Sequence, residues 1–127
     1  MTRDLENRDD IDALMVDFYE KAMSDGVIGY LFTDIAHLDL AHHLPVIGDF
    51  WETVLFSTGA YRKHGRNPLI VHAALHERSP LLPEHFQRWL ELFGECVDKL
   101  FAGPRAEFAK LRARGVSLRM IEYLGNC

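Results

Sequence analysis

The sequence predicts an all-α fold, and three observations support this. Apolar residues recur with a period near 3.6, and no segment alternates with the period of two that marks a strand. Prolines, glycines and capping residues divide the chain into five or six amphipathic segments, whose unequal lengths argue against a symmetric four-helix bundle. The 127 residues suffice for one domain with a sizeable core, so we expect a single domain over residues 1–127.

The first helix is expected to begin at a cap formed by Asp9 or Asp10 and to end near Gly26. Residues 27–38 are short and mixed, which indicates a turn of helix and a loop. The apolar stripe of this helix consists of Ile11, Leu14, Met15, Phe18 and Ala22.

The second helix contains Pro45, which we expect in its first turn, where the missing N–H has no partner within the helix. The helix then begins near Ala41 or later and closes at Gly59, before a basic loop over residues 60–66. Its apolar positions are Leu44, Ile47, Phe50, Trp51, Val54 and Leu55.

Three further helices are marked by proline. Asn67 and Pro68 predict the start of a short helix, Pro83 opens a long one, and Gly103 followed by Pro104 ends that helix and begins the last. The long helix carries Phe86, Trp89, Leu90, Phe93, Val97, Leu100 and Phe101 on one stripe. The last is expected to bury Phe108, Leu111, Leu118, Ile121 and Leu124.

Composition excludes several classes of protein. The net charge of −5 disfavours a nucleic-acid or anionic-membrane partner, and no apolar run approaches the roughly 18 residues of a membrane span. The start MTRDLENRDD has no signal-peptide pattern, so we expect a cytoplasmic protein. Cys96 and Cys127 form no CxxC or CxxCH motif, and their roles stay open, as does the oligomeric state.

Seven histidines are many for this length, and helical spacing sorts them. His43 faces the same way as Ile47 and Phe50, whereas His42 lies on a more polar face. From spacing alone, His43 is most simply a histidine at the edge of the core. The surface or loops are expected to hold His37, His64 and His85.

His72 shares a helix face with apolar neighbours, and His76 follows four residues later. Such a pair can chelate a metal, but the HExxH zinc motif is missing. A satisfied or half-exposed histidine is therefore the simplest interpretation of His72.

Tyr19 and Trp89 each place a polar tip among apolar residues, and such tips usually find a hydrogen-bond partner. Packing in the core, with the polar tip hydrogen-bonded, is the simplest interpretation of both.

Sequence motifs for serine hydrolases, P-loops, dinucleotide binding and paired-carboxylate metal sites are missing. A solvated face is the expected setting of Arg112, Arg114 and Arg119.

In their order and separations, four pieces of the chain resemble a truncated hemoglobin of the third group, a bacterial class. They are Phe18-Tyr19, then His43 with Ile47, Gly48, Phe50 and Trp51, then Pro68 to His72, then Phe86-x-x-Trp89-Leu90-x-x-Phe93. The resemblance spans residues 11–101 and implies a shortened globin fold, a two-over-two helical sandwich around haem b.

The resemblance also implies roles for residues. His72 matches the proximal iron ligand, Tyr19 the distal tyrosine, His43 the distal histidine and Trp89 the tryptophan beside the ligand. Pocket-wall positions are matched by Phe18, Ile47, Phe50, Trp51 and Phe93. Haem would be bound non-covalently, since CxxCH is missing.

The activity implied is binding of dioxygen, nitric oxide or carbon monoxide at ferrous iron. A strongly hydrogen-bonded ligand leaves slowly, which favours consumption of nitric oxide or peroxide over oxygen transport and requires an external reductase. A haem-based sensor or helical interaction module, and a non-haem metal site at His72 and His76, remain alternatives. The resemblance favours an oxygen-binding protein with dioxygenase-like or peroxidase-like redox activity.

One segment departs from the family pattern. The join between Tyr61 and Pro68, with sequence RKHGRN, is longer than the resemblance implies for the loop at the haem edge. Neutralisation of the haem propionates could come from Arg62, Lys63 or Arg66, and the sequence does not choose among them.

Overall fold

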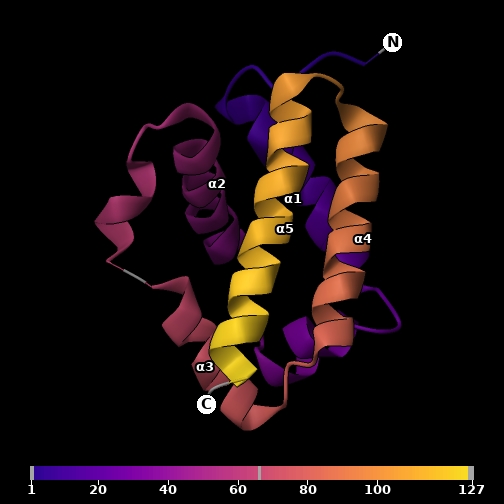
Figure 1. Ribbon diagram of the computed structural model, residues 1–127, viewed down its shortest axis with the longest axis vertical. Coiled ribbons are helices and arrows are strands. Elements are labelled where there is room, and N and C mark those ends of the chain that lie inside the picture. The colour runs from indigo at the N-terminus through magenta and orange to yellow at the C-terminus, as the bar shows by residue number, and fades with distance from the viewer. Residues whose placement is uncertain (1, 66, 126–127) are drawn as a thin grey trace.

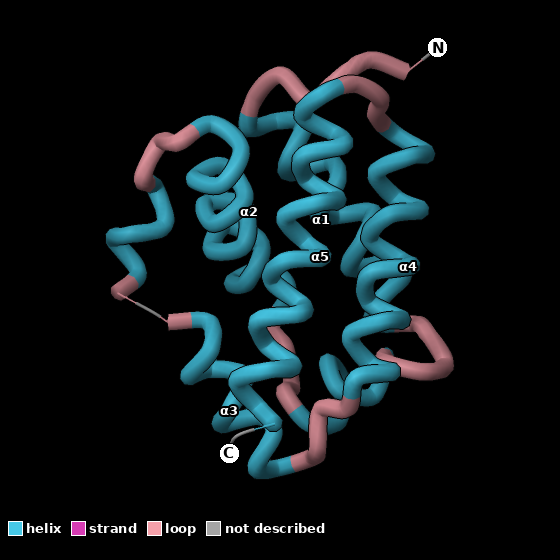
Figure 2. The backbone as a smooth tube through the Cα atoms, viewed as in Figure 1, coloured by secondary structure: helices cyan, strands magenta, loops and turns pink. Residues whose placement is uncertain are grey.

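The computed structural model describes residues 2–65 and 67–125, and helices dominate this part of the chain (Figure 1, Figure 2). Its α-helices are α1 (Arg8–Met23), α2 (Leu40–Phe56), α3 (Pro68–Arg78), α4 (Pro83–Leu100) and α5 (Pro104–Gly125). Between them lie the π-helix η1 (Leu31–Ile35) and the 3-10 helix η2 (Ala60–His64). Within the described residues, β pairing is limited to an isolated bridge between Arg3 and Phe101, so the all-α prediction is confirmed.

The helices pack as two pairs, α1 with α2 and α4 with α5, and α1 also packs on α4. In Figure 1, α5 lies in front, with α2 and α3 on one side and α4 on the other. This is the predicted two-over-two arrangement. The shared core includes the fully buried side chains of Leu14, Phe18, Phe93 and Val97. None of the helices in the described ranges is long and apolar enough to cross a membrane.

Three helix starts lie where the sequence predicts them. The Asn67 side chain accepts a hydrogen bond from the Leu69 backbone N–H, and Pro68 is the first residue of α3. Pro83 and Pro104 open α4 and α5 in the same way. A proline at this position loses no hydrogen bond within the helix, which explains why these starts are readable from sequence.

The predicted ends of the first two helices need correction. Asn7 caps α1, not Asp9 or Asp10, and the helix stops before Gly26. The α2 helix stops at Phe56, where Ser57 takes the left-handed conformation (φ 57°), so Gly59 is not its terminator. The expected loop after it contains η2 instead.

Pro45 lies inside α2, which corrects the expectation that it belongs to the first turn. The helix begins at Leu40, and the Asp39 carboxylate accepts a hydrogen bond from the His42 backbone N–H. A proline cannot donate to the carbonyl one turn earlier. The turn of α2 that carries His43 therefore has one internal hydrogen bond fewer than an ordinary helical turn.

The buried face of α5 also differs from the prediction. Phe108, Leu111 and Leu118 are 43%, 64% and 60% exposed. The buried residues of this helix are Ala106, Ala109, Ala113, Ser117, Met120 and Leu124. Because α5 packs along α4, small side chains at the contact let the two helices approach closely. Leu124 is buried and Ile121 is half-buried as predicted, whereas Phe108, Leu111 and Leu118 lie on the exposed side of the helix.

Cys96 is fully buried in α4. Burial, followed by a hydrogen bond with Asp17, raises the pKa of the Cys96 thiol to about 11. The thiol is therefore protonated at neutral pH. Cys127 lies outside the described residues.

Candidate functional site

Tyr19 of α1 and His43 of α2 form a hydrogen-bonded pair in the interior. The Tyr19 side chain is buried, and its hydroxyl lies 2.9 Å from His43 Nε2. The two rings meet edge to face, with centroids 5.2 Å apart. Burial raises the pKa of Tyr19 above its usual range, so the phenol keeps its proton and remains a hydrogen-bond donor.

A stack of three aromatic rings lies beside this pair. The Phe93 ring stacks on Trp51 at a centroid distance of 5.0 Å and on Trp89 at 5.4 Å. Phe18 stands edge-on to Trp89 and Phe93, each at 5.7 Å, and touches the Tyr19 ring at 5.1 Å. A single ring, Phe18, therefore contacts both Tyr19 and Trp89.

Ile47 and Phe50 of α2 extend the same wall. Both are half-buried and pack against the core. Phe50 meets Trp51 edge-on at 5.5 Å and Tyr61 of η2 at 5.3 Å. The residues predicted for the distal side thus gather on facing surfaces of α1, α2 and α4.

His72 lies on α3, and a hydrogen bond selects its tautomer. Nδ1 donates to the Pro68 carbonyl oxygen, 2.7 Å away and one turn earlier. Because a carbonyl can only accept, Nδ1 carries a proton, and in the neutral imidazole the lone pair is then on Nε2. A neutral imidazole oriented in this way by a backbone carbonyl is a suitable axial ligand for haem iron. The donor chemistry of His72 therefore fits haem.

His76 has a different setting from His72. Its Nδ1 accepts a hydrogen bond from the Leu81 backbone N–H at 2.9 Å, which fastens the end of α3 to the connection into α4. In residues 2–65 and 67–125, no group of three His, Cys, Asp or Glu side chains is placed to hold a metal ion. A non-haem site at His72 and His76 would thus find no third ligand in this part of the chain.

The remaining histidines are not all at the surface. His37 is exposed, with a left-handed backbone (φ 49°). His85 is half-buried, and its Nδ1 accepts from the Leu82 backbone N–H at 3.0 Å. His64, also expected at the surface, joins a buried charge cluster instead.

That cluster is centred on Asp49, a carboxylate only 5% exposed, and the sequence did not reveal it. Asp49 lies 2.6 Å from Arg8 Nη1, 2.7 Å from His64 Nε2 and 3.2 Å from Lys63 Nζ. A Cβ on Gly48 would come within 2.5 Å of Arg8 Nη2, so glycine lets the guanidinium lie across α2. The cluster fastens η2 and the start of α1 to α2.

Replacing Asp49 with asparagine should destabilise the protein by about 1–2 kcal/mol at pH 7 and have little effect near pH 2. Burial alone would raise the pKa of Asp49, but hydrogen bonds from Arg8, His64 and Lys63 lower it to about 2. This stabilisation is present above the unfolded-state pKa of roughly 4 and is lost as the pH falls toward 2. Urea unfolding of both proteins from pH 2 to 7 measures it, and a pH-independent difference would contradict the assignment.

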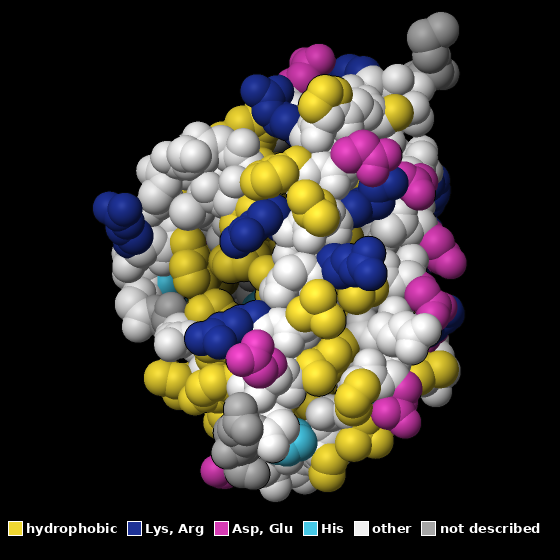
Figure 3. Space-filling model, in the orientation of Figure 1, with side chains coloured by type: hydrophobic (Ala, Val, Ile, Leu, Met, Phe, Trp, Pro, Cys, Tyr) yellow, Lys and Arg dark blue, Asp and Glu magenta, His cyan; other side chains and the backbone are white. Residues whose placement is uncertain are grey.

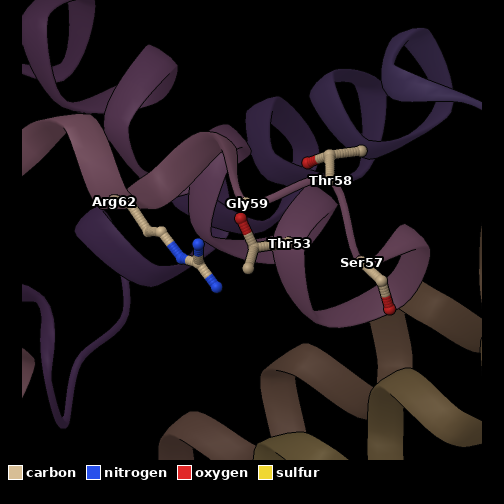
Figure 4. A pocket seen from close by; sticks show the side chains of 5 residues that line it. All are labelled: Thr53, Ser57, Thr58, Gly59 and Arg62. Carbon is tan, nitrogen blue, oxygen red and sulfur yellow. The ribbon is translucent and has the colours of Figure 1, made fainter.

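A depression of about 330 Å³ opens where α2 meets η2. It is lined by Thr53, Ser57, Thr58, Gly59 and Arg62 (Figure 4). In Figure 4 the Arg62 guanidinium reaches across the opening toward Thr53. Of the other cations predicted near the haem edge, Lys63 is bound to Asp49, and Arg66 lies outside the described residues.

The molecular face in Figure 3 is hollowed between α2 and α5. Apolar side chains (yellow) form the interior of the hollow, and Lys and Arg side chains (dark blue) stand at its edges. Several apolar residues of α2, α3 and α4 are half-buried and pack against the core. Among them are Val54, Ala73, Leu75 and Leu90. An apolar cleft with cationic edges suits a flat, largely apolar group that carries negative charge at its rim.

Both the sequence and the fold of this chain are similar to those of known proteins. No family model matches the chain. The group 3 truncated hemoglobin ctb of Campylobacter jejuni is 32% identical over 98 residues, which cover 75% of this chain and 72% of that protein. The crystal structure of group III truncated hemoglobin from Campylobacter jejuni superimposes with a TM-score of 0.83 at 28% identity, covering 98% of this chain and 95% of that chain. On this evidence of sequence and fold, the chain belongs to the group III truncated hemoglobins.

Proposed function

We propose that this chain, as a single domain over residues 1–127, binds haem b non-covalently with His72 as the iron ligand. Membership of a truncated hemoglobin family implies a haem cofactor and a globin-type site for a small ligand. The observation that supports His72 most strongly is its Nδ1–H bond to the Pro68 carbonyl oxygen, which directs the lone pair to Nε2. Covalent attachment would need a CxxCH motif, which the sequence lacks.

The ligand side of the site is assigned to the residues around Tyr19. When bound, haem would supply a ferrous iron that can coordinate a diatomic ligand. Tyr19 O–H and Trp89 N–H are the proposed hydrogen-bond donors toward that ligand. Water is excluded by the apolar walls, which consist of Phe18, Ile47, Phe50, Trp51 and Phe93.

His43 is proposed as a gate that also competes for the Tyr19 hydroxyl. Its ring nitrogen lies 2.9 Å from that hydroxyl, and its helical turn is weakened by Pro45. When His43 swings outward, a path opens and the Tyr19 O–H becomes available to the ligand.

The substitution His43→Leu should therefore speed dioxygen association and slow its dissociation, each by about threefold to tenfold. Leucine cannot accept from Tyr19, so the phenol donates to the ligand alone. Flash photolysis gives the association rate, and ligand replacement in a stopped-flow instrument gives the dissociation rate. Faster dissociation in the variant would instead make His43 a principal donor to the ligand.

The proposed activity is binding of dioxygen, with nitric oxide and carbon monoxide as further ligands. Two donors on one small ligand slow its release, which suits oxygen-dependent consumption of nitric oxide, or of peroxide, better than oxygen transport. Turnover would draw electrons from an external reductase. We propose a cytoplasmic setting for this chemistry.

The test measures dioxygen dissociation and nitric oxide consumption on the same haem-loaded preparation, with a chemical reductant in excess. The proposal expects slow dissociation and repeated turnover of nitric oxide. Tight dioxygen binding without turnover would contradict the consumption role and favour a haem-based sensor.

A further inference from the structure

We propose that Arg112 and Arg119 of α5 bind the carboxylates of the haem propionates. This inference rests on the proposed function and deepens it, since it assigns the charged rim of the site. The sequence predicts a solvated face for both residues. It suggests Arg62, Lys63 or Arg66 as the partners of the propionates.

Many cationic side chains of the chain are already paired with carboxylates. Ion pairs with carboxylates engage Arg3, Arg8, Lys21, Lys63, Arg88, Lys99 and Lys110. Among the residues that the structure describes, no carboxylate lies within ion-pair distance of Arg62, Arg78, Arg105, Arg112, Arg114 or Arg119. The net charge of the chain is −5, yet four of these six arginines lie on α5.

Arg112 and Arg119 lie on one flank of α5. They follow Arg105 at intervals of seven residues, so the three side chains lie along nearly the same flank. Arg105 fixes which flank this is, because its guanidinium carbon lies 4.9 Å from the centroid of the Phe56 ring of α2. The flank therefore faces α2.

The opposite flank of α5 provides a contrast. Lys110 binds Asp98 of α4 at 2.6 Å, and Lys110 and Arg114 line a small depression together with Leu90 and Gly94 of α4. Arg114 is thus on the side of α5 that faces α4, away from α2. It has the same charge and exposure class as Arg112 and is only two residues away, which makes it a matched control.

A cleft lies beside these arginines. The hollow between α2 and α5 is apolar inside, and dark blue side chains stand along the α5 edge (Figure 3). Both α2 and α3 pack on α5, so α5 borders the space between the helices that carry His43 and His72. A haem held by His72 in this space would need cationic partners at the rim for its two carboxylates. A guanidinium fork matches a carboxylate better than any other side chain.

The test compares haem release from Arg112→Ala, Arg119→Ala, their double variant, Arg62→Ala and the Arg114→Ala control. Each ferric protein is loaded either with haem b or with haem b dimethyl ester, whose propionates carry no charge. We expect the double variant to release haem b about tenfold faster than wild type, with a smaller difference at high salt. Arg114→Ala should match wild type, and the ester should leave all variants at one common rate.

Three outcomes would overturn the inference. Unchanged release from the double variant would do so, as would a loss confined to Arg62→Ala. Equal acceleration with haem and its ester would show that the arginines act by packing, not by charge. If the wild-type chain retained no haem at all, the proposed function itself would be overturned. That outcome differs from failure of the inference, in which the wild type retains haem and the arginine variants release it at the same rate.

Discussion

Replacing His72 with alanine should lower haem affinity by on the order of a hundredfold or more, so that the purified variant loses its Soret absorption band. His72 is the α3 histidine whose Nδ1–H is held by the Pro68 carbonyl oxygen at 2.7 Å. With no covalent attachment, the remaining apolar contacts would hold haem without a fixed axial ligand. Absorption spectroscopy during haem titration measures the change.

His76→Ala is the matched control on the same helix. Its Nδ1 accepts from the Leu81 N–H, so its loss should reduce stability modestly and leave the Soret band in place. A second variant, His72→Gly, should recover its absorption when free imidazole is added, which separates ligand loss from misfolding. Loss of haem in His76→Ala with retention in His72→Ala would reverse the assignment.

Tyr19→Phe and Trp89→Phe should each speed dioxygen dissociation by about tenfold to a hundredfold. A charge-assisted hydrogen bond is worth about 1.5–3 kcal/mol, and about 1.4 kcal/mol corresponds to a factor of ten. Dioxygen takes on more negative charge in a ferrous haem pocket than carbon monoxide does. Dissociation of carbon monoxide should therefore change far less, and stopped-flow measurements on both ligands supply the comparison.

The double variant adds a test of coupling. Tyr19 and Trp89 both contact Phe18 and address one small ligand, so their effects should not add. Removing Trp89 can even let Tyr19 donate with better geometry, since a bound ligand would then compete only with His43, which lies 2.9 Å from the Tyr19 hydroxyl, for that donor. Equal changes for dioxygen and carbon monoxide would mean that both rings act by packing or access.

The sequence predicted the fold well where one residue decides the outcome. Pro68, Pro83 and Pro104 each begin a helix because proline at that position loses nothing. The same rule misplaced Pro45, since α2 tolerates a proline beyond its first turn. Whether a helix tolerates a proline beyond its first turn depends on tertiary packing, which the local sequence does not show.

The face of α5 shows a second limit. Large apolar residues predicted a stripe through Phe108, Leu111 and Leu118, yet these three are exposed, and four of the six buried positions are alanines or a serine, with Met120 and Leu124 completing the set. Hydrophobicity alone ranks leucine above alanine for burial, whereas the close approach of α5 to α4 selects small volume.

Of the candidate site, spacing placed His43 toward the core, and the structure pairs it with Tyr19. The Asp49 cluster was missed because its partners Arg8 and His64 lie 41 and 15 residues away in sequence. Those separations carry no periodic signal, so such a cluster becomes visible only when the helices are placed together.

Haem titration of the wild-type protein tests most directly whether this chain binds haem through a histidine on α3. We expect saturation at one haem per chain, a Soret band, and an iron–histidine vibration in the ferrous protein that disappears in His72→Ala. A chain that folds but shows no saturable Soret band, or one whose iron–histidine vibration survives in His72→Ala, would contradict this expectation.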